Sequence, residues 1–209
     1  MRIIYILLDM TWEIFFKTVL AVIIGGGLLT AVVTIFFQQY FKKRERNDAV
    51  EYLALRLAFL FEGYGVNCAA YISEYDTVVK EEKDYTSYFG EGVPIISSIP
   101  FEEAHKFLDR VLLNDILDFP QRCTMANSHG DYLSELGDNN GYCTFISEEY
   151  IRMGVQAMSI GKQLREKYNL TARELIFGGF NPEKFLKNKL IETEERKERN
   201  KQQQADLQK

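Results

Sequence analysis

The stretch TVLAVIIGGGLLTAVVTIFF, residues 18–37, decides how this chain is organised. Its twenty residues include no charged side chain. At about 1.5 Å per residue, a helix of this length spans roughly 30 Å, which is the thickness of the hydrocarbon core of a bilayer. Buried helices of soluble proteins can be as apolar, but they are usually shorter. The run therefore predicts one membrane-spanning helix within residues 14–41.

A cleaved signal peptide is the main alternative, and the residues that follow the run argue against it. The apolar part of a signal peptide is normally about 7–15 residues long and ends at a small-x-small cleavage site. Here the apolar run is longer, and it continues into FFQQYFKKRER (36–46), which offers no such site. We therefore expect an uncleaved signal-anchor and a single-pass protein.

Charges beside the run predict its direction in the membrane. Residues 42–46 (KKRER) hold four basic side chains and one acidic one, whereas the N-terminal flank balances two bases with two acids. Basic residues next to a span stay on the cytoplasmic side. We expect residues 1–13 outside the cell membrane and the C-terminal body in the cytoplasm. The basic residues expected to meet lipid head groups are Lys42, Lys43, Arg44 and Arg46.

Small and polar residues within the run predict contact with another membrane helix. Read at intervals of four, they form stripes along one side of the helix. Such stripes let helix backbones approach closely, so the expected partner is a second copy of the chain or another membrane protein. The competing interpretation is that Gly25–Gly27 only bend or loosen the helix. The predicted contact residues are Ala21, Gly25, Gly26, Thr30, Thr34 and Gln38.

The body of the chain is acidic, which argues against nucleic acid as a partner. Residues 47–182 contain 11 basic and 21 acidic side chains. Binding to nucleic acid rests largely on Lys and Arg that neutralise phosphates. The dense basic cluster at 42–46 lies directly beside the apolar run, where membrane lipid is its simplest partner.

Helical periodicity dominates the body of the chain. Apolar residues recur at three- and four-residue steps over Val50–Tyr64, Phe101–Ile116 and Tyr150–Tyr168. Strand signals are few. We therefore expect a mostly α protein, in which a basic joint (42–47) connects the span to a cytoplasmic bundle of about four to six helices at 48–191.

Turn-forming residues predict where the helices end. Asp118-Phe119-Pro120 should break one helix, because proline removes a backbone donor and clashes with the preceding turn. The segment GDNNG (137–141) predicts a loop before a helix that starts near Ser147. The tail at 192–209 is almost wholly polar, which favours either a solvated helix or disorder.

One cluster of residues suggests chemistry. Cys123 and His129 could form a nucleophile and its base, with Asp131 orienting the imidazole, and these are the best catalytic candidates. Cys143 and His105 could join Cys123 and His129 around zinc, but their spacing matches no zinc module. The competing interpretation is a set of small buried thiols and surface imidazoles. We therefore predict no metal and no cofactor, and favour a protein that is not an enzyme.

Three functions agree with this sequence. The leading hypothesis is a membrane-anchored cytoplasmic domain that acts through protein–protein interaction, by recruiting, sensing or assembling with another component. The first alternative is a membrane-proximal enzyme that uses the Cys/His cluster. The second is an oligomerising effector that acts on the membrane through its transmembrane helix. No motif in the chain is specific enough to name a substrate or a partner.

Overall fold

The computed structural model describes residues 2–80, 88–90 and 92–207. It describes their side chains as well, except at 2–16, 18–31, 80, 103 and 105. The chain divides into two compact units, Met1–Ala49 and Val50–Lys209.

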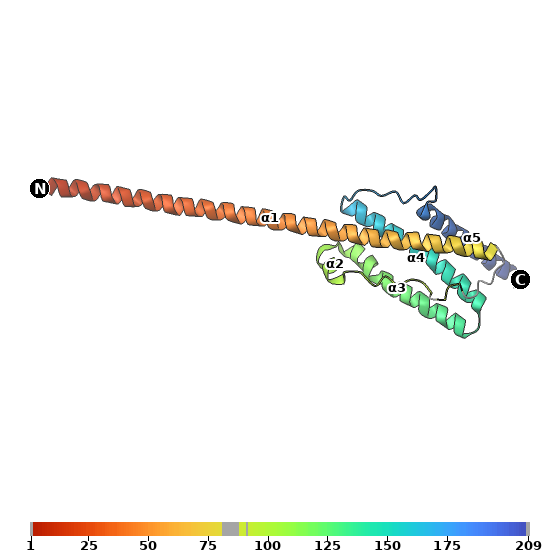
Figure 1. The fold of residues 1–209 in the computed structure, drawn as a ribbon. Coiled ribbons are helices and arrows are strands. Elements are labelled where there is room, and N and C mark those ends of the chain that lie inside the picture. Colours follow the sequence, from red (N-terminus) through yellow and green to blue (C-terminus); the bar gives the residue numbers. More distant parts are fainter. Residues whose placement is uncertain (1, 81–87, 91, 208–209) are drawn as a thin grey trace. The chain divides into compact units, whose positions relative to one another are not determined.

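Helices account for nearly all of the secondary structure in the described residues, as Figure 1 shows. They are α1 (Arg2–Lys80), α2 (Phe101–Phe107), α3 (Arg110–Glu135), α4 (Asn139–Lys167) and α5 (Pro182–Leu207). An isolated bridge between Phe177 and Phe180 is the sole β pairing among these residues. The predicted mostly helical bundle is confirmed.

In the first unit, α1 passes through the whole of the apolar run 18–37. Within the part of the chain whose side chains are described, no helix is both long enough and apolar enough to cross a membrane. Most of the predicted span lies outside that part, at residues 18–31. The same is true of four residues in the predicted association stripe: Ala21, Gly25, Gly26 and Thr30.

In the second unit, the predicted apolar faces meet in one core. Leu53 and Leu57 of α1 are at most 2% exposed, and Ile116 of α3 is fully buried. Each such side chain contributes about 1.5–3 kcal/mol when it leaves water, so these faces hold the bundle together. The predicted face of α4 is buried at Tyr150, Met153, Ala157, Ile160 and Leu164.

Two glycines allow α4 to pack closely on its neighbours. A Cβ atom at Gly161 would lie 2.8 Å from Cγ of Glu62 on α1. One at Gly154 would lie 2.8 Å from Cδ1 of Leu186 on α5 and 2.9 Å from Cβ of Cys68 on α1. No larger residue fits at either position without displacing a neighbour, so these glycines set the spacing between the helices.

The predicted helix break at 118–120 is wrong, because α3 continues through Pro120. A proline inside a helix costs roughly 3 kcal/mol, so tertiary packing must offset it. The preceding Phe119 is fully buried, and its ring packs edge-on against Phe61 and Tyr64 of α1 with centroids 5.2 and 5.0 Å apart. These aromatic contacts stabilise the helix at a position where sequence rules predict a break.

The chain instead breaks at Asp109, between α2 and α3. Leu108 and Asp109 adopt extended backbone angles, and the Asp109 carboxylate accepts a hydrogen bond from the backbone N–H of Val111 at 3.1 Å. An aspartate at this position satisfies a donor that the first turn of a helix leaves unpaired. The helix boundary therefore lies at a capping side chain, and not at the proline where the sequence predicts it.

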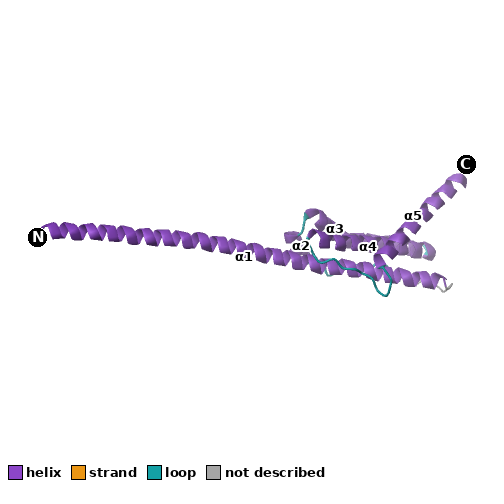
Figure 2. Cartoon of the chain, turned by 90° about the horizontal axis from the view of Figure 1, so that it is seen from above, coloured by secondary structure: helices purple, strands orange, loops and turns teal. Residues whose placement is uncertain are grey.

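The start of α4 also differs from the prediction. The helix begins at Asn139 and not near Ser147, because Asp138 caps it by accepting from the N–H of Gly141 at 2.8 Å. At the other end of the chain, α5 continues to Leu207, so residues 192–207 are helical. Figure 2 shows the last part of α5 projecting away from the other helices of the second unit.

Residues 88–90 and 92–100, which precede α2, form no helix or strand, yet side chains of the bundle hold their backbone. The amide of Asn127 donates to the carbonyl of Val93 at 2.8 Å and accepts from its N–H at 2.7 Å. The phenol of Tyr150 donates to the carbonyl of Gly92 at 2.9 Å. The side chains of α3 and α4 thus supply the hydrogen bonds that a strand or helix would otherwise make.

Candidate functional site

The thiol of Cys123 lies in the core of the second unit and not at its surface. Its side chain is fully buried on α3, where its sulfur lies 3.6 Å from the phenol oxygen of Tyr64. Burial raises the pKa of the Cys123 thiol, and burial raises the pKa of the neighbouring Cys68 to about 12. A nucleophilic cysteine needs a thiolate, so this environment keeps both thiols unreactive at neutral pH.

His129 and Asp131 are both exposed on α3, whereas that thiol is buried. Six residues separate Cys123 from His129, which places them about 120° apart around the helix. His129 and Asp131 are about 160° apart, so the carboxylate points away from the imidazole. The imidazole instead packs edge-on against Phe145 of α4, with ring centroids 4.6 Å apart. The structure does not bring these three residues together.

The residues considered for zinc belong to three helices, α2, α3 and α4. Cys143 lies on α4 and is fully buried. The side chain of His105 is outside the described residues. In the part of the chain that the structure describes, no group of three or more His, Cys, Asp or Glu side chains is arranged to hold a metal ion.

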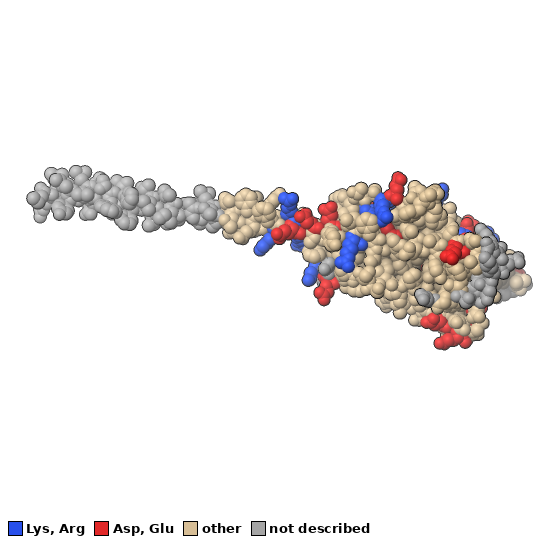
Figure 3. Space-filling model, viewed as in Figure 1, with Lys and Arg blue, Asp and Glu red and all other residues tan. Residues whose placement is uncertain are grey.

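In the first unit, residues 32–41 of α1 present large apolar side chains to solvent, and we call this surface the collar. Its seven large apolar side chains are 49% to 71% exposed, and they point to most sides of the helix. Thr34 and Gln38 of the predicted stripe are exposed within it. In Figure 3 the collar is the tan section of the helix between the grey atoms and the first blue side chains. The collar consists of Val32, Val33, Ile35, Phe36, Phe37, Tyr40 and Phe41.

The predicted basic residues follow the collar directly. Lys42, Lys43, Arg44 and Arg46 are all exposed on α1. Aromatic rings next to basic side chains are the arrangement found where a helix leaves the apolar layer of a bilayer and enters its head groups. The collar and these four residues thus form one continuous surface that suits a lipid interface.

A shallow groove of about 440 Å³ lies between α3 and α4, and His129 lines it. Met125, which is 64% exposed, and Phe145 also line the groove. Arg122 also lines the groove and donates to the side-chain oxygen of Gln156 at 3.3 Å. Arg152 and Glu149 also line the groove, and they form an ion pair with each other. Arg122 therefore gives the groove one excess positive charge beside its apolar side chains.

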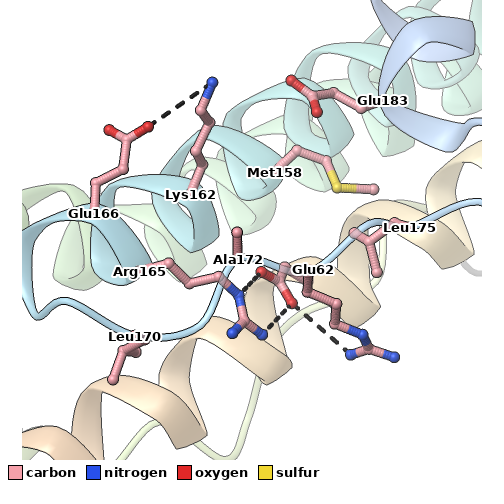
Figure 4. A pocket seen from close by; sticks show the side chains of 10 residues that line it. Glu62, Met158, Lys162, Arg165, Glu166, Leu170, Ala172, Leu175 and Glu183 are labelled. Carbon is pink, nitrogen blue, oxygen red and sulfur yellow. Dashed lines mark hydrogen bonds and ion pairs between the residues drawn. The ribbon is translucent and has the colours of Figure 1, made fainter.

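A second cavity, of about 240 Å³, lies between α1, α4 and the segment 168–181 that joins α4 to α5 (Figure 4). Its floor holds an ion pair between Glu62 of α1 and Arg165 of α4, whose side chains are 5% and 8% exposed. Arg165 donates to both carboxylate oxygens, and the Nη2 contact is 2.9 Å. The hydrogen bond to Glu62 also raises the pKa of Arg165.

The segment 168–181 closes over this floor through two contacts. Nη1 of Arg165 donates to the backbone carbonyl of Thr171 at 2.7 Å. The guanidinium of Arg173 lies 3.8 Å from the Glu62 carboxylate and 4.8 Å from the centre of the Phe59 ring. The Arg173 side chain is 42% exposed, so it lies between the cavity and solvent.

Sequence reasoning missed this second cavity, since its parts come from three distant segments. Glu62 and Arg165 are 103 positions apart, and no motif links them. One signal was present: Glu62 follows Phe61 directly and precedes Tyr64, within the apolar face of a helix. A lone acid at the edge of a buried face requires a partner, although the sequence cannot say which one.

Comparison with known proteins gives this chain no relatives from which a role could be read. No family model, curated protein or solved structure matches it.

Proposed function

We propose that this chain is a membrane-anchored helical protein whose body lies in the cytoplasm and acts by binding another protein. One observation carries the anchor: the exposed collar at 32–41, which continues the uncharged run 18–31 and ends at the basic residues 42–46. A helix that exposes apolar side chains on most of its sides is unstable in water. Lipid covers such a surface, and head groups match the basic side chains that follow.

Carbonate extraction of membranes tests the anchor. The full chain should remain with the lipid after extraction. Ile24→Arg combined with Leu28→Arg should release it, because each charge at the centre of a span costs roughly 2.5–3.5 kcal/mol. Gln203→Arg in the exposed tail is the matched control and should stay with the membrane. Release of the unchanged chain would contradict the anchor.

Cysteine labelling in intact cells tests the orientation. A membrane-impermeant maleimide should label Ile4→Cys, which we place outside the cell. It should leave Ser128→Cys unlabelled until the cells are opened, because that exposed position lies in the body. Labelling of Ser128→Cys alone in intact cells would reverse the orientation.

The groove between α3 and α4 is our candidate for the binding surface. It combines exposed Met125 with the ring of Phe145, and it carries one excess positive charge in a body of 11 basic and 21 acidic residues. Buried aromatic and Arg side chains dominate protein interfaces, and complementary charge sets the choice of partner. The occupant that fits is an amphipathic segment of another protein that presents a carboxylate to Arg122.

Site-specific photocrosslinking in the native membrane tests this surface. A photoreactive residue at Met125 should capture a partner whose crosslinked peptide contains Asp or Glu, and Arg122→Glu should abolish the adduct. The same probe at the exposed Glu198 of α5 should give none. An adduct between two copies of this chain, or one that Arg122→Glu leaves unchanged, would contradict the proposed occupant.

A further inference from the structure

We propose that the cavity under segment 168–181 binds a small amphiphilic carboxylate, with Arg173 as the group that receives its charge. The inference goes beyond the membrane anchor and the α3–α4 groove, and it rests on residues of the second unit alone. Figure 4 shows the side chains of α1, α4 and the segment converging on this space.

Charge within the cavity points to a monoanion. Lys162 and Glu166 of the lining form an ion pair at 3.9 Å, and Glu183 of the lining is balanced at 2.5 Å by Lys187, which lies outside the lining. The remaining charged groups in the lining are Glu62, Arg165 and Arg173. One carboxylate there faces two guanidinium groups, which leaves one positive charge in excess.

Geometry assigns that excess charge to Arg173. Arg165 is bound on three sides, by both oxygens of Glu62 and by the carbonyl of Thr171. Arg173 approaches Glu62 only to 3.8 Å, which is longer than a hydrogen bond. Its guanidinium lies 4.8 Å from the centre of the Phe59 ring, and a guanidinium group can bind a carboxylate in the bidentate manner.

The rest of the lining favours an apolar tail. Met158, Leu170, Ala172 and Leu175 supply the uncharged side chains of the cavity. A cavity of about 240 Å³ has room for several water molecules, which suits a carboxylate with a short hydrocarbon chain. Met158 adapts easily to such a chain, because its thioether side chain is flexible and polarisable.

Titration with hexanoate tests the proposal on the full chain in lipid nanodiscs. The ¹³C methyl signals of the five methionines are followed, and the Met158 signal is identified by its loss in Met158→Leu. Hexanoate should shift the Met158 signal in a saturable way, whereas the signal of exposed Met125 should stay in place. Partition of hexanoate into lipid does not act on one methyl group alone, so the readout reports this cavity.

Matched ligands and variants decide the outcome. Arg173→Gln should weaken the binding of hexanoate at least tenfold, whereas Arg199→Gln in the exposed tail should leave that affinity unchanged. Hexanol should bind at least tenfold more weakly than hexanoate. Ala172→Phe should abolish the shift by filling the cavity. Equal binding of hexanoate and hexanol, an unchanged affinity in Arg173→Gln, or no shift of Met158 at millimolar hexanoate in the folded chain would each overturn the proposal.

Discussion

Arg165 of α4 donates hydrogen bonds to both carboxylate oxygens of Glu62 on α1, and the two side chains are 8% and 5% exposed. Each charge is stable in the core because the other compensates it. The pair therefore joins two helices that 103 positions of sequence separate, and it lies directly below the segment 168–181.

Removal of one partner should destabilise the bundle strongly. Arg165→Met should lower the free energy of unfolding by about 3 kcal/mol, because the buried Glu62 carboxylate loses both hydrogen bonds from Arg165 and keeps the longer 3.8 Å contact with Arg173. Denaturant unfolding followed by circular dichroism measures the loss. Lys162→Met breaks a pair that is 66% exposed on both sides, and it should cost less than about 1 kcal/mol.

Glu62→Leu combined with Arg165→Met provides the internal check on this prediction. The double variant removes both charges, so it should recover most of the stability that Arg165→Met loses. If the single variant cost no more than Lys162→Met, the ion pair would not hold α1 and α4 together.

Two glycine-to-alanine substitutions should have opposite effects. Gly154→Ala should destabilise by roughly 1–3 kcal/mol, because its Cβ would meet Leu186 at 2.8 Å and Cys68 at 2.9 Å. Gly63→Ala should stabilise by roughly 0.5–1 kcal/mol, because that helical position has nothing within 4 Å. Thermal unfolding of both variants measures the difference.

The close contact at Gly154 also predicts coupling to α5. Leu186→Ala removes the side chain that Gly154→Ala would strike, so the two substitutions together should cost less than the sum of their separate effects. Strict additivity would show that α5 does not dock on α4 at this point.

The cap of α3 should respond to pH. A hydrogen bond from Lys167, at 2.9 Å, and the N–H of Val111 hold the pKa of Asp109 below its usual value. A carboxylate with a lowered pKa stabilises the folded state fully above its ordinary pKa, and this contribution is lost as the pH falls through the lowered one. Carboxyl NMR titration should show the Asp109 pKa rising toward its ordinary value in Lys167→Gln. Lys162→Gln, which leaves the cap intact, should not move it.

The cysteines should resist thiol reagents while the chain is folded. All three are buried, and burial raises the pKa of Cys68 to about 12, so thiolate is scarce at pH 8. A membrane-permeant maleimide should label none of them within the time that it labels Ser128→Cys on the surface. In denaturant all three should react, as intact mass would show. Rapid labelling of Cys123 in the folded chain would restore it as a candidate nucleophile.

Much of the helical architecture was readable from the sequence, because the period of apolar residues fixes which side of a helix avoids water. The faces that begin at Leu53 and at Tyr150 are buried as that period predicts. Helix ends were not readable to the same degree. Pro120 fits inside α3 since Phe119 packs against two rings of α1, and that contact exists only in the folded chain.

The sequence by itself determined the apolar run at 18–37, its basic boundary at 42–46 and the helical class of the body. These features depend on the composition and periodicity of neighbouring residues, so a short stretch of sequence is enough to predict them. Only the tertiary structure decided that Cys123 is buried beside Tyr64 of α1, and that Glu62 meets Arg165. The physical reason is that a side chain's charge, exposure and pKa depend on what packs against it, and helices distant in sequence supply those neighbours.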